Sequence, residues 1–133
     1  MMKKAATVFG SLAVALGGTL LVAPAAHAAT CWGSGCYGLD PNAAGCGGDA
    51  YTAASAQTSQ GLVELRYSPS CNANWARISS SSPGTWFEVA DCQSPYQAQS
   101  YNVPSGYASG WTNMVDGSPT AQAIDDAGGT ACV

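Results

Sequence analysis

Hydrophobic and polar residues alternate with a period of two through the middle of the chain. The pattern is clearest in LVELRY, residues 62–67, and recurs in WARIS, residues 75–79, and TWFEVA, residues 85–90. Successive side chains of a β-strand point to opposite faces, so this period predicts three half-buried strands. Two further strands are predicted at QSYNV, residues 99–103, and GWTNMV, residues 110–115.

The segments on either side of these strands have weaker patterns. Residues 31–48 are rich in Gly and Cys and contain the turn-forming pair Asp40-Pro41. Residues 49–61 fit either a short capped helix or a strand, and residues 116–133 have a loop-like composition. We therefore expect a small, mainly β domain: a disulfide-stabilised antiparallel β sandwich or open barrel with a loop-rich N-terminal segment.

The N-terminus has the pattern of a secretory signal peptide. Two lysines precede an uncharged run rich in Ala, Gly, Leu and Val, in which Ala26 and Ala28 form an A-x-A cleavage site. The run is nearly long enough for an uncleaved transmembrane anchor, but its Ala and Gly content and its A-x-A ending favour cleavage. The sequence predicts a signal peptide over residues 1–28 and one secreted, extracellular domain over residues 29–133.

The predicted mature domain is small and acidic. Removing 28 of 133 residues leaves 105, with two arginines against eight carboxylates, a net charge of −6. It contains neither Lys nor His, because Lys3, Lys4 and His27 all precede the predicted cleavage site. Binding to nucleic acid or anionic lipid depends on cationic side chains. The composition therefore argues against a nucleic-acid partner, and against a membrane partner after cleavage.

Six cysteines lie in the predicted mature domain, and an even number in an oxidising compartment predicts three disulfide bonds with fifteen possible connectivities. The alternative is a zinc site at the first three cysteines, which the absence of His makes unfavourable. An EF-hand-like stretch beginning at Asp40 has Ala44 and Tyr51 where calcium ligands are needed. We expect no metal and no cofactor. The cysteines are Cys31, Cys36, Cys46, Cys71, Cys92 and Cys132.

Both arginines fall on the central predicted strands. If the aliphatic residues of the three strands face the core of one meander, the opposite face carries the charged and large aromatic residues. That face is either a set of cross-strand pairs that stabilise the sheet or a recognition platform, where rings stack on a ligand and charged groups hydrogen-bond to it. The candidate binding residues are Glu64, Arg66, Trp75, Arg77, Trp86 and Glu88.

Enzymatic chemistry has few candidates in this composition. Without His or Lys, no Ser-His-Asp, Cys-His or Ser-Lys nucleophile can form, and oxidised cysteines remove thiol chemistry. A carboxylate pair of the kind that hydrolyses glycosidic bonds remains, and Glu64 and Glu88 are the candidates. Glutamates on neighbouring strands are more often partners in ion pairs. The sequence therefore favours a non-enzymatic role.

Three stretches resemble a known family. CWGSGCYGLDPNAAGCGGDA, VELRYSPSCNANWARI and YASGWTNMVDG are similar to the actinobacterial domain of unknown function 2690 family, over approximately residues 31–117. The resemblance implies an extracellular domain and assigns no activity and no catalytic residues. Cys92 and Cys132 lie outside the motif blocks, and we expect them to pair, which leaves three connectivities for the other four cysteines.

Three functions remain for a secreted domain of this kind. A cell-wall or other extracellular polysaccharide fits the predicted aromatic face and the low charge. A protein-interaction or inhibitory module would instead present loops such as PSGYASGW, residues 104–111. A small glycan hydrolase would use Glu64 and Glu88. We expect polysaccharide binding, with the other two as alternatives.

Overall fold

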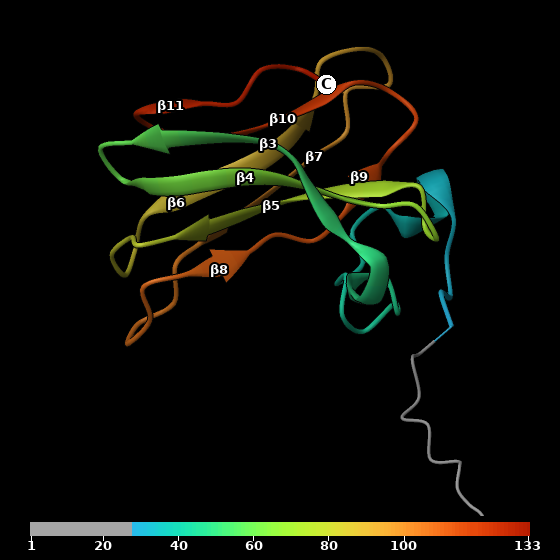
Figure 1. Cartoon of the computed structure of the whole chain (residues 1–133), viewed down its shortest axis with the longest axis horizontal. Helices are drawn as coiled ribbons and strands as arrows, with labels where there is room; N and C mark the ends of the chain where they lie inside the picture. Colours follow the sequence, from blue (N-terminus) through green and yellow to red (C-terminus); the bar gives the residue numbers. More distant parts are fainter. Residues whose placement is uncertain (1–27) are drawn as a thin grey trace, which may run out of the picture.

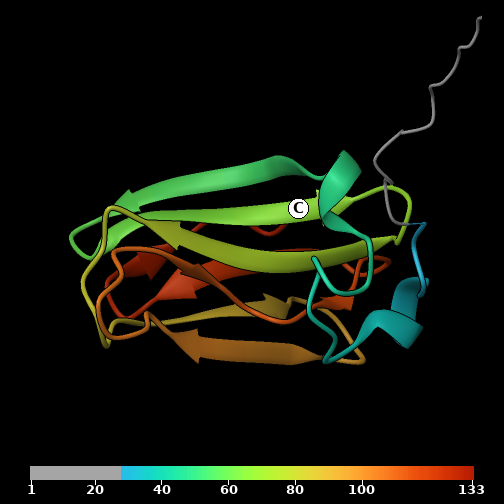
Figure 2. The ribbon, with the colours of Figure 1, turned by 90° about the horizontal axis from the view of Figure 1, so that it is seen from below.

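The protein folds as a β sandwich in the computed structural model, which describes residues 28–133 (Figure 1). The predicted signal peptide therefore lies outside the described residues, apart from Ala28. Two antiparallel sheets pack face to face, and Figure 2 shows them as two layers. Among residues 28–133, no helix has the length and apolar character needed to cross a membrane.

The first sheet contains the first two predicted period-two strands. Its order is β3-β4-β5-β8, and β9 also pairs with β5. The ambiguous segment before LVELRY is a strand, because its backbone pairs with β4 along its length, with an irregularity between Thr52 and Ala54. The strands are β3 (Tyr51–Thr58), β4 (Gly61–Ser68), β5 (Ala73–Ser79), β8 (Gly110–Trp111) and β9 (Val115–Asp116).

The second sheet has the order β11-β10-β6-β7. Two expectations are wrong here. The third period-two strand, β6, pairs with β10 and β7 and so belongs to this sheet rather than continuing the meander of β4 and β5. The tail expected to be a loop supplies β10, whose alternate residues are buried. The strands are β6 (Trp86–Asp91), β7 (Ala98–Asn102), β10 (Ala121–Asp125) and β11 (Gly128–Gly129).

The main core lies between the two sheets. It consists of the aliphatic and aromatic residues that the alternation placed on the inner faces. Phe87 and Leu65 are the two largest fully buried side chains, at 0% exposure each. The buried cluster is Val63, Leu65, Ala76, Ile78, Phe87, Val89, Val103, Val115, Ala121 and Ala123.

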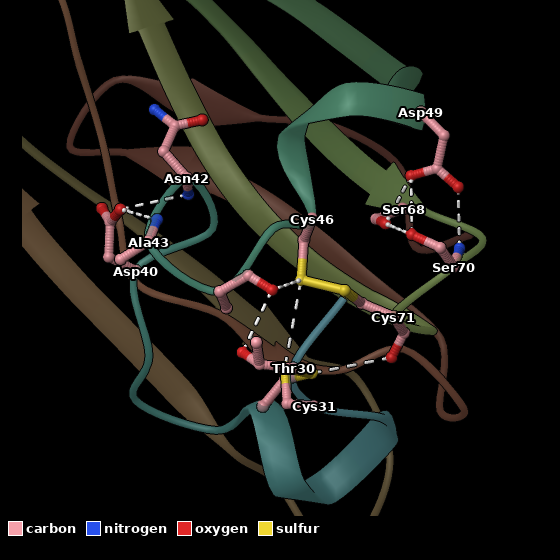
Figure 3. Close-up of a disulfide and its surroundings, with 12 residues drawn as sticks. Thr30, Cys31, Asp40, Asn42, Ala43, Cys46, Asp49, Ser68, Ser70 and Cys71 are labelled. Atoms are coloured by element: carbon pink, nitrogen blue, oxygen red, sulfur yellow. Dashed lines mark hydrogen bonds between the residues drawn. A yellow bond between two sulfur atoms is a disulfide. The ribbon is translucent and has the colours of Figure 1, made fainter. Parts of the chain in front are cut away.

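The N-terminal segment, residues 28–50, packs against one end of the sandwich (Figure 1). It contains two short 3-10 helices, η3 (Gly33–Cys36) and η4 (Gly47–Asp49). Asp49 anchors its end, because its carboxylate accepts hydrogen bonds from the hydroxyl groups of Ser68 and Ser70 and from the Ser70 backbone N–H (Figure 3).

Three disulfide bonds stabilise the domain, as the sequence predicts. Cys92–Cys132 is confirmed and ties the C-terminal residues to the end of β6. The other four cysteines pair as Cys31–Cys36 and Cys46–Cys71. Cys46–Cys71 joins the N-terminal segment to the start of β5 (Figure 3), across 25 residues of sequence.

A buried carboxylate lies at the end of β6. Asp91 is 7% exposed; its Oδ2 accepts the Gln97 backbone N–H at 3.2 Å, whereas its Oδ1 has no partner among the described residues. Burial raises the pKa of Asp91 to about 6, and the charge of Asp116 adds to this effect. In the unfolded chain an Asp titrates near 3.9, so the native state binds more protons between about pH 4 and pH 6. Asp91 therefore lowers stability as pH rises through this window.

Asp91→Asn should stabilise the protein at pH 7. The variant keeps an acceptor for the Gln97 N–H and removes the cost of a buried charge, so we expect a gain of about 1–2 kcal/mol in the free energy of unfolding. At pH 4 the gain should vanish, since wild-type Asp91 is then protonated in the native state. Urea unfolding of both proteins at the two pH values measures the difference. An equal gain at both values would contradict the titration of Asp91.

Candidate functional site

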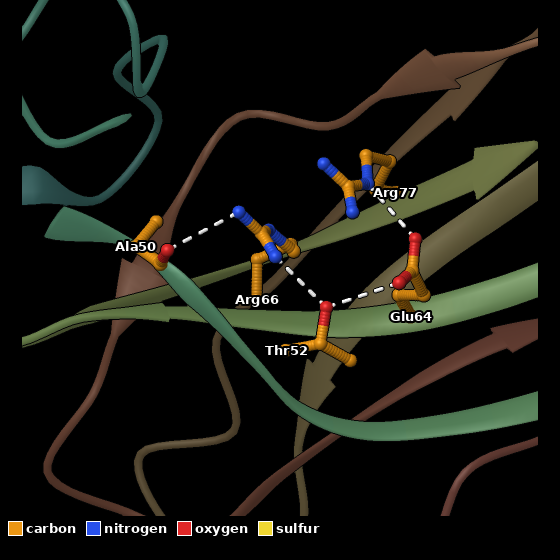
Figure 4. A network of polar contacts seen from close by, with 5 residues as sticks. All are labelled: Ala50, Thr52, Glu64, Arg66 and Arg77. Carbon is orange, nitrogen blue, oxygen red and sulfur yellow. Dashed lines mark hydrogen bonds and ion pairs between the residues drawn. The ribbon is translucent and has the colours of Figure 1, made fainter. Parts of the chain in front are cut away.

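Three charged side chains meet on the outer face of the first sheet (Figure 4). Glu64 on β4 lies opposite Arg77 on β5, and Arg66 comes from the same face of β4. Arg77 Nε donates to Glu64 Oε1 at 2.9 Å, and Arg66 donates to the hydroxyl oxygen of Thr52 at 2.8 Å and to the carbonyl of Ala50 at 3.3 Å. The alternation in the sequence thus predicts the shared face of these three residues correctly.

The hydrogen bonds define the charge state of this cluster. The hydrogen bond from Arg77 lowers the pKa of Glu64; burial opposes the shift, while the Thr52 hydroxyl and the charges of both arginines add to it. Burial lowers the pKa of Arg66, and the neighbouring charge of Arg77 acts in the same direction. Glu64 is therefore ionised at neutral pH, and two cations share one carboxylate.

Trp75 shares this face, but its ring is not free for stacking. It lies opposite Arg66 in the sheet register and is only 5% exposed. The N-terminal segment covers it, because this end of the outer face forms a second hydrophobic core. The expectation of an open Trp75 surface is therefore wrong. The second core contains Cys36, Ala44, Cys46, Cys71, Ala73, Trp75 and Met114.

Trp86 and Glu88 do not join the cluster. Both lie on β6 with alternation opposite to the core residues Phe87 and Val89, and so face outward from the second sheet. The expected convergence of six residues is wrong for these two, since their strand belongs to the other layer. Burial raises the pKa of Glu88. Glu64 and Glu88 face opposite sides of the sandwich, so they cannot flank one glycosidic bond as a hydrolytic pair.

Trp111 extends the cluster across the edge of the sheet. It lies opposite Arg77 in the register of β5 and β8 and is 44% exposed. Its indole Nε1 donates to Asp40 Oδ1 at 2.9 Å. The other oxygen of Asp40 accepts the backbone N–H groups of Asn42 and Ala43, which forms the predicted Asp-Pro turn (Figure 3). The turn thereby holds the indole in place.

A groove of about 560 Å³ opens beside Trp111. Three aromatic side chains along it are exposed, with Tyr101 at 49%, Tyr107 at 64% and Trp111 at 44%. Tyr101 comes from β7, Tyr107 from the following loop and Trp111 from β8, so the groove lies where the edges of the two sheets meet. We call it the aromatic groove; its lining is Asp40, Ser100, Tyr101, Pro104, Tyr107, Ser109, Gly110, Trp111 and Asn113.

A smaller pocket of about 140 Å³ also opens beside Trp111. Arg66, Arg77 and Trp75 line it from the sheet, together with parts of the N-terminal segment. We call it the arginine pocket; its lining is Pro41, Asn42, Gly47, Arg66, Trp75, Arg77 and Trp111. Trp111 is therefore common to both cavities.

Sequence reasoning missed the aromatic groove as a site. Tyr101 and Trp111 sit in two short predicted strands and Tyr107 in the loop between them, but alternation says nothing about how edge strands of different sheets approach each other. The loop PSGYASGW, which carries Tyr107 and Trp111, was the available signal.

Four sulfur atoms also lie together, from Cys31, Cys36, Cys46 and Cys71, all within 4.8 Å of one another. Their proximity follows from two adjacent disulfides. A metal ion there would require all four to be reduced to thiolates, so in the oxidised protein this cluster is a structural one.

Comparison with known proteins gives one match. A family described as protein of unknown function (DUF2690) matches residues 34–124, which include the arginine pair, the aromatic groove and most of η3 and β10. No curated protein and no solved structure matches the chain.

Proposed function

Because the chain belongs to the DUF2690 family, whose members are described only as proteins of unknown function, we propose its role from its own surface. It is a secreted, non-enzymatic domain that binds an extracellular polysaccharide in the aromatic groove. The observation that carries this proposal is the set of three exposed rings along one groove, from Tyr101, Tyr107 and Trp111.

The chemistry of the groove suits a sugar. One face of a pyranose ring presents C–H groups, which pack on an aromatic ring, while its edge presents hydroxyl groups. The exposed rings offer the apolar surface, and Asp40, Ser100 and Asn113 offer polar groups beside it. A volume of about 560 Å³ is in the range of small-ligand sites. Exposed aromatic rings gathered in one place are unusual on a surface without a binding role.

Two observations support a location outside the cytoplasm. Three disulfide bonds are typical of proteins in an oxidising compartment. The N-terminal pattern of lysines, an apolar run and an A-x-A site is that of a signal peptide. A protein in that location is exposed to cell-wall and matrix polysaccharides.

Trp111→Ala should weaken polysaccharide binding about tenfold or more, because a buried stacking contact at the centre of a binding site is commonly worth more than about 1.4 kcal/mol. Co-sedimentation of the oxidised protein with peptidoglycan, chitin and cellulose measures the affinity. Tyr107→Ala provides a second variant, since the Tyr107 hydroxyl makes no hydrogen bond within residues 28–133 and the ring is 64% exposed.

The matched control is Trp32→Ala. Trp32 is 64% exposed and lines neither the aromatic groove nor the arginine pocket, so its removal should leave binding unchanged. Equal affinity of wild type, Trp111→Ala and Tyr107→Ala for a bound polysaccharide would contradict the groove as its site. Absence of binding to every polymer would turn the search to a protein partner for the loop at residues 104–111.

A further inference from the structure

The two arginines have more charge and more donors than their protein partners use. They are the only cationic side chains within residues 28–133, yet they lie on the same sheet face (Figure 4). Arg77–Glu64 is the single ion pair in that part of the chain, and both groups that accept from Arg66 are neutral. The cluster of Glu64, Arg66 and Arg77 therefore carries one uncompensated positive charge.

The free donors belong to the part of Arg77 that recognises anions best. A guanidinium has five N–H donors, and Arg77 uses only its Nε–H within the described chain. Both Nη groups remain available, and the side chain is 41% exposed. A planar fork of this kind matches the two oxygens of a carboxylate.

The arginine pocket sets the size of its occupant. Its volume of about 140 Å³ is well below the roughly 300–1,000 Å³ of typical small-ligand sites. That is room for a charged substituent, not for a chain of sugars. Trp111 lines both the pocket and the aromatic groove, so a sugar that stacks on Trp111 in the groove lies beside the arginine pocket.

Within residues 28–133 an anion is attracted most to Arg66 and Arg77, and the nearby carboxylates are already engaged by other donors. Asp40 lies near, but its oxygens already accept three N–H donors, from Trp111, Asn42 and Ala43. Glu64 is held by Arg77 and Thr52. The other acidic residues give the domain its negative charge, and their field is screened beyond about 8 Å at physiological salt.

We infer that the arginine pocket binds a ligand carboxylate, and that the polysaccharide of this protein is an acidic one, built with uronic acids. This inference rests on the proposed function, since it needs a glycan in the aromatic groove. The sugar ring stacks on Trp111, and its carboxylate accepts hydrogen bonds from the Nη groups of Arg77 beside the charge of Arg66.

Methyl esterification tests the inference, because it removes the charge and keeps the polymer. Affinity electrophoresis of the oxidised protein uses polygalacturonate, alginate and hyaluronate, each paired with its methyl ester. We expect at least one uronate to bind about tenfold or more tighter than its ester, as charge-assisted hydrogen bonds are strong. Arg77→Gln should abolish that preference, so that the uronate and its ester bind with equal affinity. Arg77→Lys keeps the positive charge but loses the planar guanidinium, so it should retain only part of the preference for the uronate.

A second variant should bind the uronate more tightly than the wild type, a result that an unfolded protein cannot give. Glu64→Gln removes the anion that competes for Arg77 and keeps an acceptor for the Thr52 hydroxyl, so binding to the uronate should become several-fold tighter, with a smaller gain for the uncharged ester. A purely structural role for the cluster predicts no such gain.

The outcomes separate the two proposals. Equal affinity of the wild type for a uronate and its ester, with Trp111→Ala weakening both, would overturn the acidic specificity and retain the polysaccharide site. A preference for the uronate that persists in Arg77→Gln would also overturn the role of the arginine pocket. No binding to any of the six polymers, nor to peptidoglycan, chitin or cellulose, would overturn both proposals.

Discussion

Replacing Cys46 and Cys71 together by Ala should lower the free energy of unfolding by about 3.5 kcal/mol, among the largest effects available in this protein. The bridge closes a loop of 25 residues, and the chain-entropy relation for a loop of that length gives this magnitude. Both sulfurs are fully buried in the second core beneath the N-terminal segment, so the double variant also loses packing around Trp75. Urea unfolding followed by tryptophan fluorescence measures the change.

Cys31–Cys36 supplies the internal comparison. It closes only five residues, for which the same relation gives about 2 kcal/mol. The Cys31→Ala, Cys36→Ala variant should therefore be the more stable of the two double variants. The reverse order would mean that local packing, not loop closure, governs the contribution of these bridges.

Phe87→Ala should destabilise the protein by about 3–5 kcal/mol, the cost typical of a large aromatic removed from a core. Phe87 belongs to the core between the sheets and is its largest fully buried side chain. Its ring also meets Tyr101 edge to face at 6.3 Å between centroids and lies under Gly110. The substitution thus removes the support of two strands that line the aromatic groove.

Phe87→Leu is the matched variant, since it refills most of the volume and should recover more than half of the lost stability. Urea unfolding measures both proteins, and polysaccharide binding is then compared under conditions where each is folded. A loss below about 1 kcal/mol in Phe87→Ala would contradict the central position of this ring, because even partial relaxation leaves a cavity there.

The period-two pattern predicted the strands well because half-burial is a local property. LVELRY and WARIS lie in strands, as does TWFEVA from Trp86 onward, with the expected residues facing inward. The strand β10 escaped prediction because its buried side chains include the small residues Ala121 and Ala123, which contrast little with their neighbours.

The arrangement of strands into sheets was beyond the sequence pattern. Alternation tells which residues share a face of a strand, but not which strands are neighbours. Glu64, Arg66 and Arg77 were grouped correctly because β4 and β5 are joined by a short turn between them. The connection from Ser79 to Trp86 instead crosses to the other layer, so Trp86 and Glu88 lie in the second sheet.

The positions of the cysteines in the sequence do indicate that Trp75 is covered. Four of the six cysteines lie at or before Cys71, and a segment fixed by disulfides at one end of a sheet must cover whatever lies beneath it. The sequence contains a weaker signal for the aromatic groove, because the groove forms where β7, β8 and the Asp40 turn meet, and these segments are distant in sequence.

Because Trp111 lines both cavities, it constrains where a bound sugar can carry its carboxylate. A ligand that fills both cavities must place its carboxylate near Arg77 while its sugar ring stacks on Trp111 in the groove. Two uronates of equal charge therefore differ in fit when their glycosidic linkages turn the carboxylate toward or away from the next ring. Linkage geometry, rather than charge density, then decides which polymer the protein retains.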